Sequence, residues 1–180
     1  MSLQATAWQT VGPYFRIGLE HLDTLPIAPP DAPGERVEIE GRVVDGHGRP
    51  VPDAVIEIWQ ANADGNYSDD TGGFRGFGRI PTDAEGRFAF STIKPGAVPG
   101  PGGRLQAPHL AVRLMMRGLL KDLVTRMYFP GEELAADPVL QLVPKLRRTT
   151  LVARRANESG TAFVWEIELQ GARETVFFDY

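Results

Sequence analysis

Glycine and proline are the residues that most constrain the fold of this chain. Its 180 residues include 20 glycines and 15 prolines. Both residues disfavour the interior of an α-helix, glycine through its backbone freedom and proline through its missing N–H group. A helix bundle is therefore a poor fit, and the composition favours short strands joined by many tight connections.

The apolar residues recur with the two-residue period of β-strands. In residues 37–40, Val and Ile alternate with Glu. Asp and Gly favour tight turns at 45–48 and 83–86. We predict an all-β fold, a β-sandwich of mostly antiparallel strands, with short helical segments in the connections, one of them starting at Asp137 and Pro138. The predicted strands are 37–44, 55–59, 88–93, 109–115, 124–129, 150–154, 163–169 and 175–178.

Residues 1–36 have a different character. They hold several prolines and little periodicity, so we predict an extended arm ahead of a sandwich domain formed by residues 37–180. A purely polar arm would normally be disordered. This one carries Trp8, Tyr14 and Phe15, and we therefore expect it to pack, either on the chain's own body or on a partner.

Charge and composition exclude several classes of protein. The net charge of −4 offers no attraction to nucleic acid or to an anionic membrane. The most apolar stretch, 111–124, is interrupted by charged residues and is too short to cross a bilayer. The chain has no cysteine, which excludes disulfides and thiolate metal sites. Since residues 1–10 show no export signal pattern, we expect a cytoplasmic protein.

The histidines are the remaining candidates for chemistry. Neither a phosphate-binding loop nor a Gly-x-Ser-x-Gly elbow is present, and His21, His47 and His109 are too scattered for a hydrolytic triad. His109 begins a predicted strand, in which a His-x-His pair would point two metal ligands to one side. The residue two positions later is Ala111, which has no ligand atom. These residues favour a structural histidine with a hydrogen-bonded ring.

Seven motifs follow one another along most of the chain. They are residues 41–45 (GRVVD), 50–54 (PVPDA), 57–67 (EIWQANADGNY), 77–79 (FGR), 82–86 (TDAEG), 92–96 (TIKPG) and 125–129 (TRMYF). In content and order they resemble the core of the intradiol ring-cleavage dioxygenases. The resemblance implies a β-sandwich in which two tyrosines and two histidines hold ferric iron, and which cleaves catechols between the two hydroxylated carbons.

The resemblance assigns each ligand position separately. The first tyrosine corresponds to Tyr67, and the second position holds Val98. The two histidine positions are His109 and Ala111, and Gln106 stands where the family has an arginine. Two of the four positions therefore have no ligand atom. Because Fe(III) is a hard cation that suits anionic oxygen donors, we expect this chain alone not to bind it.

One branch of the family is built from two homologous chains, and residues 9–14 (QTVGPY) and 174–180 (ETVFFDY) resemble its iron-free α chain. This implies that Fe(III) lies in a homologous β subunit, within a higher (αβ)n oligomer. It also implies that the arm, residues 1–36, packs on this partner. There the arm would line the pocket in which 3,4-dihydroxybenzoate and O2 give 3-carboxy-cis,cis-muconate.

The residues expected to line that pocket are Thr10, Gly12, Pro13, Tyr14 and Arg126. Thr10 and Tyr14 carry hydroxyl donors, Gly12 allows close backbone approach and Pro13 fixes φ. The guanidinium of Arg126 would attract the carboxylate of the substrate. Structural alternatives are that Tyr14 only anchors the arm and that Arg126 forms a surface ion pair. Two other functions stay open, an autonomous dioxygenase with an altered ligand set and a non-catalytic, transthyretin-like binding module.

Overall fold

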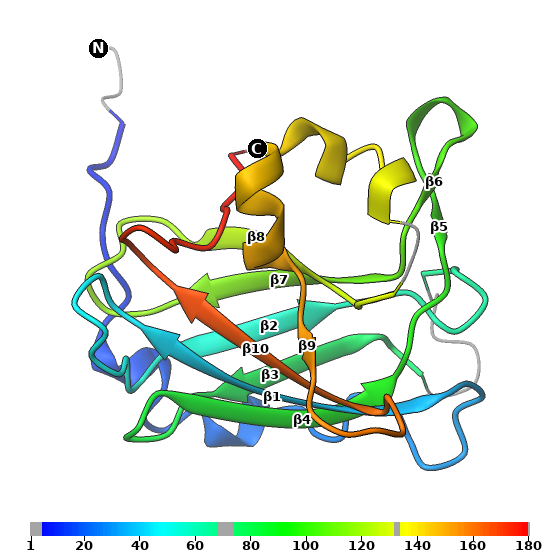
Figure 1. Ribbon diagram of the computed structural model, residues 1–180. Coiled ribbons are helices and arrows are strands. Elements are labelled where there is room, and N and C mark those ends of the chain that lie inside the picture. The colour runs from blue at the N-terminus through cyan, green and yellow to red at the C-terminus, as the bar shows by residue number, and fades with distance from the viewer. Residues whose placement is uncertain (1–4, 68–73, 132–133, 180) are drawn as a thin grey trace.

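The computed structural model describes residues 5–67, 74–131 and 134–179. Two four-stranded sheets pack face to face, with short 3-10 segments above one of them (Figure 1). The first sheet consists, in spatial order, of β4 (Arg87–Ile93), β1 (Arg36–Val44), β10 (Ala162–Glu168) and β9 (Arg154–Arg155). The second consists of β3 (Phe77–Pro81), β2 (Val55–Trp59), β7 (His109–Met115) and β8 (Leu123–Tyr128). The prediction of an all-β sandwich is confirmed.

Pairing between the described strands is antiparallel, with one exception. β1 and β10 run parallel, whereas the other sheet neighbours run in opposite directions. A separate two-stranded ribbon, β5 (Val98–Pro99) with β6 (Leu105–Gln106), projects beside the sandwich (Figure 1). This ribbon leads directly into β7, so it lies next to the strand that begins with His109.

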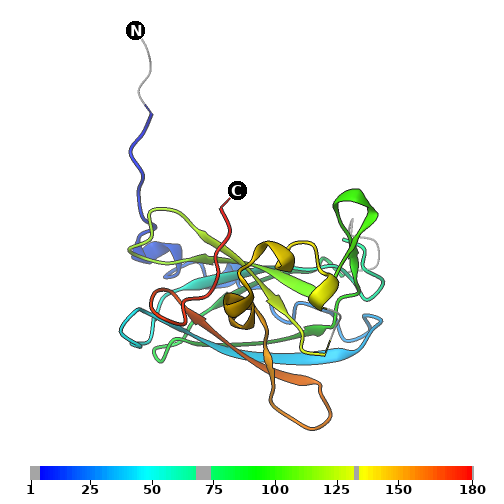
Figure 2. The same cartoon turned by 45° about the horizontal axis from the view of Figure 1, so that its top comes forward.

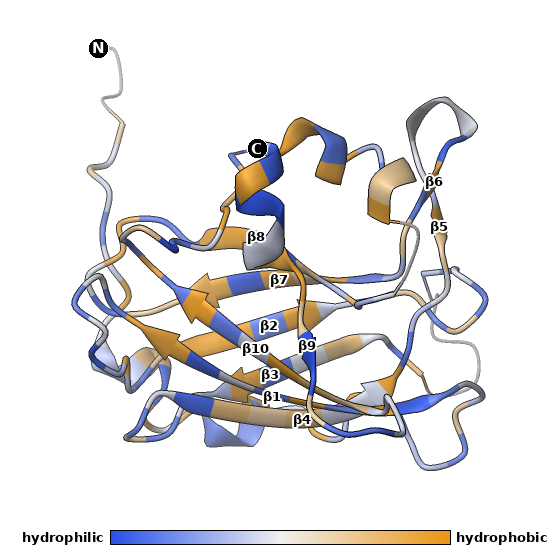
Figure 3. Ribbon diagram, in the orientation of Figure 1, coloured by the Kyte–Doolittle hydropathy of each residue, from blue (hydrophilic) through white to orange (hydrophobic). Residues whose placement is uncertain are grey.

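The hydrophobic core lies between the two sheets. Along β1, buried Val37 and Ile39 alternate with the exposed Glu38 and Glu40, and the strands of Figure 3 show the same change between apolar and polar residues. This is the period that the sequence displays, because successive side chains of a strand point to opposite faces.

Two predicted strands are wrong or reduced. The segment 150–154 overlaps a 3-10 segment, η6 (Lys145–Leu151), and only Arg154–Arg155 pair as β9. A local hydrogen bond favours the 3-10 turn over a strand, since the hydroxyl of Thr150 donates to the carbonyl of Arg147 at 2.8 Å. The segment 175–178 forms a single bridge, between Phe178 and Val124. Conversely, β3 escaped prediction as a strand because its glycine and proline mask the pattern.

Part of the N-terminal arm packs on the chain's own sandwich. It contains two 3-10 turns, η1 (Pro13–Phe15) and η2 (Glu20–Leu22). Thr24 then pairs with Arg79 along the edge of β3, and Ile27 is buried in the core. The arm therefore covers one edge of the second sheet, as sandwich proteins commonly do with exposed strand edges.

Residues 5–10 are exposed, and the residues ahead of Thr10 extend away from the body (Figure 2). The first strand begins at Arg36, close to the predicted start of the sandwich domain. The packing of the arm on a partner subunit stays a prediction. In the described part of the chain, no helix combines the length and the apolar character needed to cross a membrane.

Candidate functional site

The second sheet turns one face away from the core, and we call it the outer face. Directly opposed residues of a sheet point to the same side, so the register defines which residues share this face. Ala111 of β7 lies opposite Trp59 of β2 on one side and Arg126 of β8 on the other. His109 lies opposite Tyr128. The outer face thus includes Phe77, Arg79, Glu57, Trp59, His109, Ala111, Arg113, Val124, Arg126 and Tyr128.

Two loops bring the tyrosine positions of the family to this face. The ring of Tyr67 stacks on Trp59, with 6.3 Å between centroids. Gly65 packs so closely on the second loop that a Cβ there would lie 1.9 Å from the carbonyl oxygen of Ala97. Val98 is buried and pairs with Gln106, three residues before His109. The four positions that the family resemblance assigns to iron ligands therefore lie near the same end of the outer face.

His109 is a buried and neutral member of this group. Its side chain is 2% exposed, and its ring packs at a tilt on Tyr128, with 5.6 Å between centroids. Nδ1 lies 2.8 Å from the carbonyl oxygen of Ala107, which can only accept, so Nδ1 carries the proton. Burial, reinforced by the positive charge of Arg126, lowers the pKa of His109 to about 4.

A buried carboxylate organises the surroundings of His109. Asp137 accepts the N–H of Ala107 at 2.8 Å and the hydroxyl of Tyr128 at 3.1 Å. It also accepts the N–H groups of Val139 and Leu140 at 2.9 and 2.7 Å. A helical segment was predicted to start at Asp137 and Pro138, but η5 (Leu140–Leu142) begins three residues after Asp137 and has Val139 at its N-cap position. Burial is the main cause that raises the pKa of Tyr128, so this phenol stays protonated.

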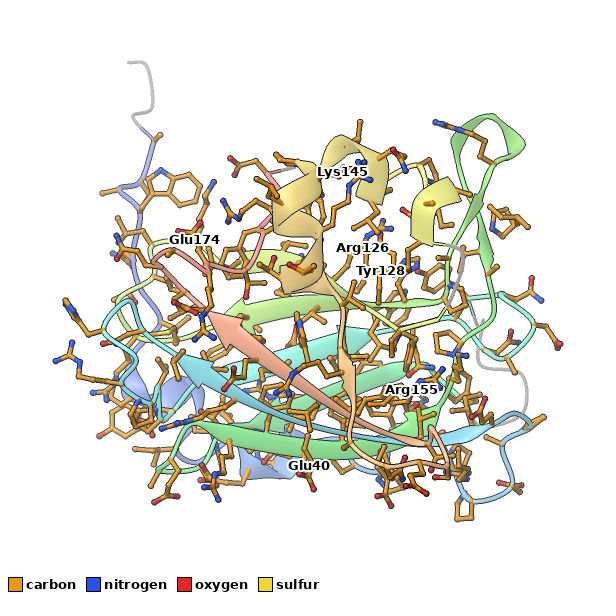
Figure 4. All side chains as sticks on the ribbon, in the orientation of Figure 1. Glu40, Arg126, Tyr128, Lys145, Arg155 and Glu174 are labelled. Carbon is orange, nitrogen blue, oxygen red and sulfur yellow. The ribbon has the colours of Figure 1, made fainter. Side chains whose placement is uncertain are left out.

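Arg126 reaches across the outer face toward the β5–β6 ribbon. Its Nη1 donates to the side-chain oxygen of Gln106 at 2.7 Å, and the amide of Gln106 lies 3.4 Å from the carbonyl of Pro99. Figure 4 shows Arg126 beside Tyr128, beneath the 3-10 segments. A guanidinium is permanently charged. The side chain that replaces the second histidine, Ala111, therefore has a fixed cation as its cross-strand partner.

These residues do not fit a ferric ion. Of the four inherited positions, only Tyr67 and His109 have ligand atoms, and Arg126 adds a positive charge where a metal would need anions. Within residues 5–67, 74–131 and 134–179, no three His, Cys, Asp or Glu side chains lie close enough together to hold a metal. The face keeps the frame of the family site with altered side chains.

The arm residues lie at a different place from Arg126. The hydroxyl of Thr10 accepts the N–H of Gly118 at 2.8 Å, which places it on the connection between β7 and β8. Tyr14 is 77% exposed, and Gly12 and Pro13 are exposed as well. Arg126 instead contacts Gln106 at the other end of β8. The described contacts bring Thr10 to Tyr14 together and leave Arg126 apart from them.

Two residues of the site were missed from the sequence. Arg79 is 5% exposed and binds the arm, and its only signal was the short FGR motif. Gln106 was noted only as a substitution, although it is the direct partner of Arg126. In both cases the contact joins residues far apart in the chain, which residue types and spacing do not reveal.

Comparisons with known proteins support the family resemblance. A family model described as a dioxygenase matches residues 11–171. The protocatechuate 3,4-dioxygenase alpha chain of Burkholderia cepacia is 44% identical, over 99% of this chain and 98% of that protein. The beta chain from the same organism is 41% identical, over 76% of this chain and 64% of that protein.

Solved structures share the fold. The dioxygenase domain of a dioxygenase and carbohydrate-binding protein fusion from Streptomyces sp. SirexAA-E aligns with a TM-score of 0.66 and 26% identity. The alignment covers 81% of this chain and 86% of that one. The matched sandwich is the one that carries the altered outer face. The chain belongs to the intradiol dioxygenase family.

Proposed function

We propose that this chain serves as the iron-free α subunit of a heteromeric protocatechuate 3,4-dioxygenase. In this role it lines the Fe(III) site of a homologous β subunit, where 3,4-dihydroxybenzoate and O2 give 3-carboxy-cis,cis-muconate. The observation that carries the proposal is the pairing of Ala111 with Arg126 on a face that otherwise keeps the family frame. A chain with this face needs a partner to supply the metal.

The relatives support the same assignment. The alpha chain of Burkholderia cepacia matches along nearly the whole length of this chain, arm included, whereas its beta chain matches over a smaller share. That both alpha and beta chains are homologous supports a heteromer in which the two subunits share one fold. We propose that αβ units join into a higher oligomer.

The proposed substrate-binding residues are Thr10, Gly12, Pro13, Tyr14 and Arg126. The exposed segment from Gly12 to Tyr14 supports a contact outside the chain, because an arm that only anchored itself would bury its aromatic ring. In this chain the hydroxyl of Thr10 already accepts a hydrogen bond from Gly118. We therefore propose that Thr10 both holds the segment in place and contacts the substrate.

Arg126 is proposed as the group that favours the carboxylate of the substrate. The residue is half-buried, and its bond to Gln106 fixes the direction of the side chain. Arg126 lies apart from the arm within one chain. Arg126 and the arm can therefore contact the same substrate molecule only if the partner's site extends over both regions.

We also propose a cytoplasmic location, because a chain without cysteine needs no oxidising compartment.

Co-production with a homologous chain that retains two tyrosines and a His-x-His pair tests the proposal. The expected result is visible colour from an iron–tyrosinate site, bound iron and ring cleavage in the mixture, and none of these in this chain alone. Iron and activity in this chain alone would support the autonomous dioxygenase instead. A mixture that forms no complex and no activity would favour the transthyretin-like binding module.

A further inference from the structure

Arg79 is a buried arginine on the outer face that contacts the arm in three ways. Its Nη2 donates to the carbonyl of Phe15 at 2.9 Å, and its guanidinium lies over the Phe15 ring, 4.9 Å from the centroid. Its own carbonyl accepts the N–H of Thr24 at 3.0 Å. The same guanidinium faces Glu57, its cross-strand partner, at 3.8 Å. One residue therefore joins both ends of the segment 15–24 to the sheet.

Phe15 is the neighbour of the exposed segment that is proposed to meet the partner. It closes η1, in which its N–H donates to the carbonyl of Gly12 at 3.0 Å. On the other side of the segment, Thr10 is held by the N–H of Gly118 at 2.8 Å. Residues 11–14 thus lie between two fixed points, and Tyr14 is presented outward from a short, tethered turn.

We propose that Arg79 is a positioning residue that sets the direction in which residues 12–14 meet the partner's site. The inference rests on the proposed function of the arm, and adds the residue on which that function depends. Arg79 acts through Phe15 and η1 and touches no substrate itself. Because the guanidinium of Arg79 is buried, its contacts with Phe15 and Glu57 restrict its movement, and this fixes the position of the arm.

The planar fork of arginine is what this position requires. One edge binds the Phe15 carbonyl, another faces Glu57, and the flat surface stacks on an aromatic ring. A lysine carries the same charge on a compact ammonium group, which has three donors but lacks the planar fork and the flat surface that lies over the ring. An Arg79→Lys exchange therefore keeps the charge and loses the geometry.

The test compares complexes of a homologous iron-bearing β chain with four forms of this chain, the unchanged chain, R79K, R113K and a form lacking residues 1–14. Arg113 is the matched control, since it lies on the same face and its ion pair is with Asp122 at 2.8 Å. The readouts are the KM and kcat for 3,4-dihydroxybenzoate, the visible absorption of the iron, and hydrogen exchange of the Phe15, Arg16 and Ile17 amides.

For R79K we expect the KM to rise about tenfold, as loss of a charge-assisted hydrogen bond implies. The kcat should change less than about threefold and the absorption not at all, because the iron ligands belong to the partner. Exchange should quicken at residues 15–17 and stay unchanged in β1 and β10, which shows that the sandwich is intact. R113K should match the unchanged chain.

Two results would overturn the inference while leaving the proposed function in place. The first is a higher KM in the shortened form with an unchanged KM in R79K. The second is an R79K complex that loses iron absorption and kcat together, which would mark a general structural role. An unchanged KM in the shortened form would overturn the proposed role of the arm and the inference with it.

Discussion

Arg126 and Ala111 are direct partners across the β7–β8 ladder. In a His-x-His pair beginning at His109, the second imidazole would project from the position of Ala111, next to this guanidinium. The missing ligand, at Ala111, and the fixed positive charge, at Arg126, therefore lie next to each other on the same face. Together they convert a face shaped for a metal into one that favours anions.

The carboxylate role of Arg126 predicts a difference between two substrates. In the assembled enzyme, R126A should raise the KM for 3,4-dihydroxybenzoate by about tenfold or more, since it removes a charged hydrogen-bond donor. The KM for unsubstituted catechol should stay within about twofold. Steady-state kinetics with both substrates measure this, and R113A is the control. Equal effects on the two substrates would refute the role.

Restoring ligands should not be enough to restore iron. We predict that V98Y/A111H still takes up little ferric iron, and that V98Y/A111H/R126Q takes up clearly more. At a separation of about 5 Å and an effective dielectric constant of about 20, the guanidinium opposes each unit of metal charge by about 3 kcal/mol. Iron content after dialysis and visible absorption measure the uptake. Equal loading of both variants would show that Arg126 does not obstruct the site.

The pKa of His109 predicts how stability depends on pH. The folded pKa of about 4 lies below the ordinary value of 6.5, so between these values the unfolded chain binds the extra proton. The contribution of neutral His109 to the free energy of unfolding should be fully present above pH 6.5. It should fall by about 3 kcal/mol as the pH drops toward 4. Urea unfolding of the unchanged chain and H109N at several pH values measures this. The same slope in H109N would assign the effect to other groups.

The sequence was sufficient for the sandwich and insufficient for the site. The strands with clear alternation, such as β1 and β10, form where they were predicted because burial on one face determines them. Thr150 lies in a predicted strand and instead hydrogen-bonds to Arg147, a local preference that alternation does not record. The degenerate ligand positions came from the family resemblance. The roles of Gln106 and Arg79 needed the three-dimensional register.

The carboxylate of Asp137 should be important for stability. It is fully buried and accepts four hydrogen bonds, three from backbone N–H groups and one from Tyr128. D137A would leave these donors buried without an acceptor and should lower the free energy of unfolding by about 3–5 kcal/mol. D179A, at a side chain that is 89% exposed, should leave the unfolding midpoint unchanged. A midpoint in D137A equal to that of D179A would contradict this.

A substitution at Gly12 can distinguish an effect on the contact with the partner from an effect on the stability of this chain. No atom lies within 4 Å of a Cβ built at Gly12, and its φ of −85° suits any residue. G12A should therefore change the stability of the isolated chain by less than about 0.5 kcal/mol. In the assembled enzyme the added methyl group would meet the partner where close backbone approach is proposed. The KM for 3,4-dihydroxybenzoate should rise several-fold, whereas an unchanged KM would remove Gly12 from the pocket.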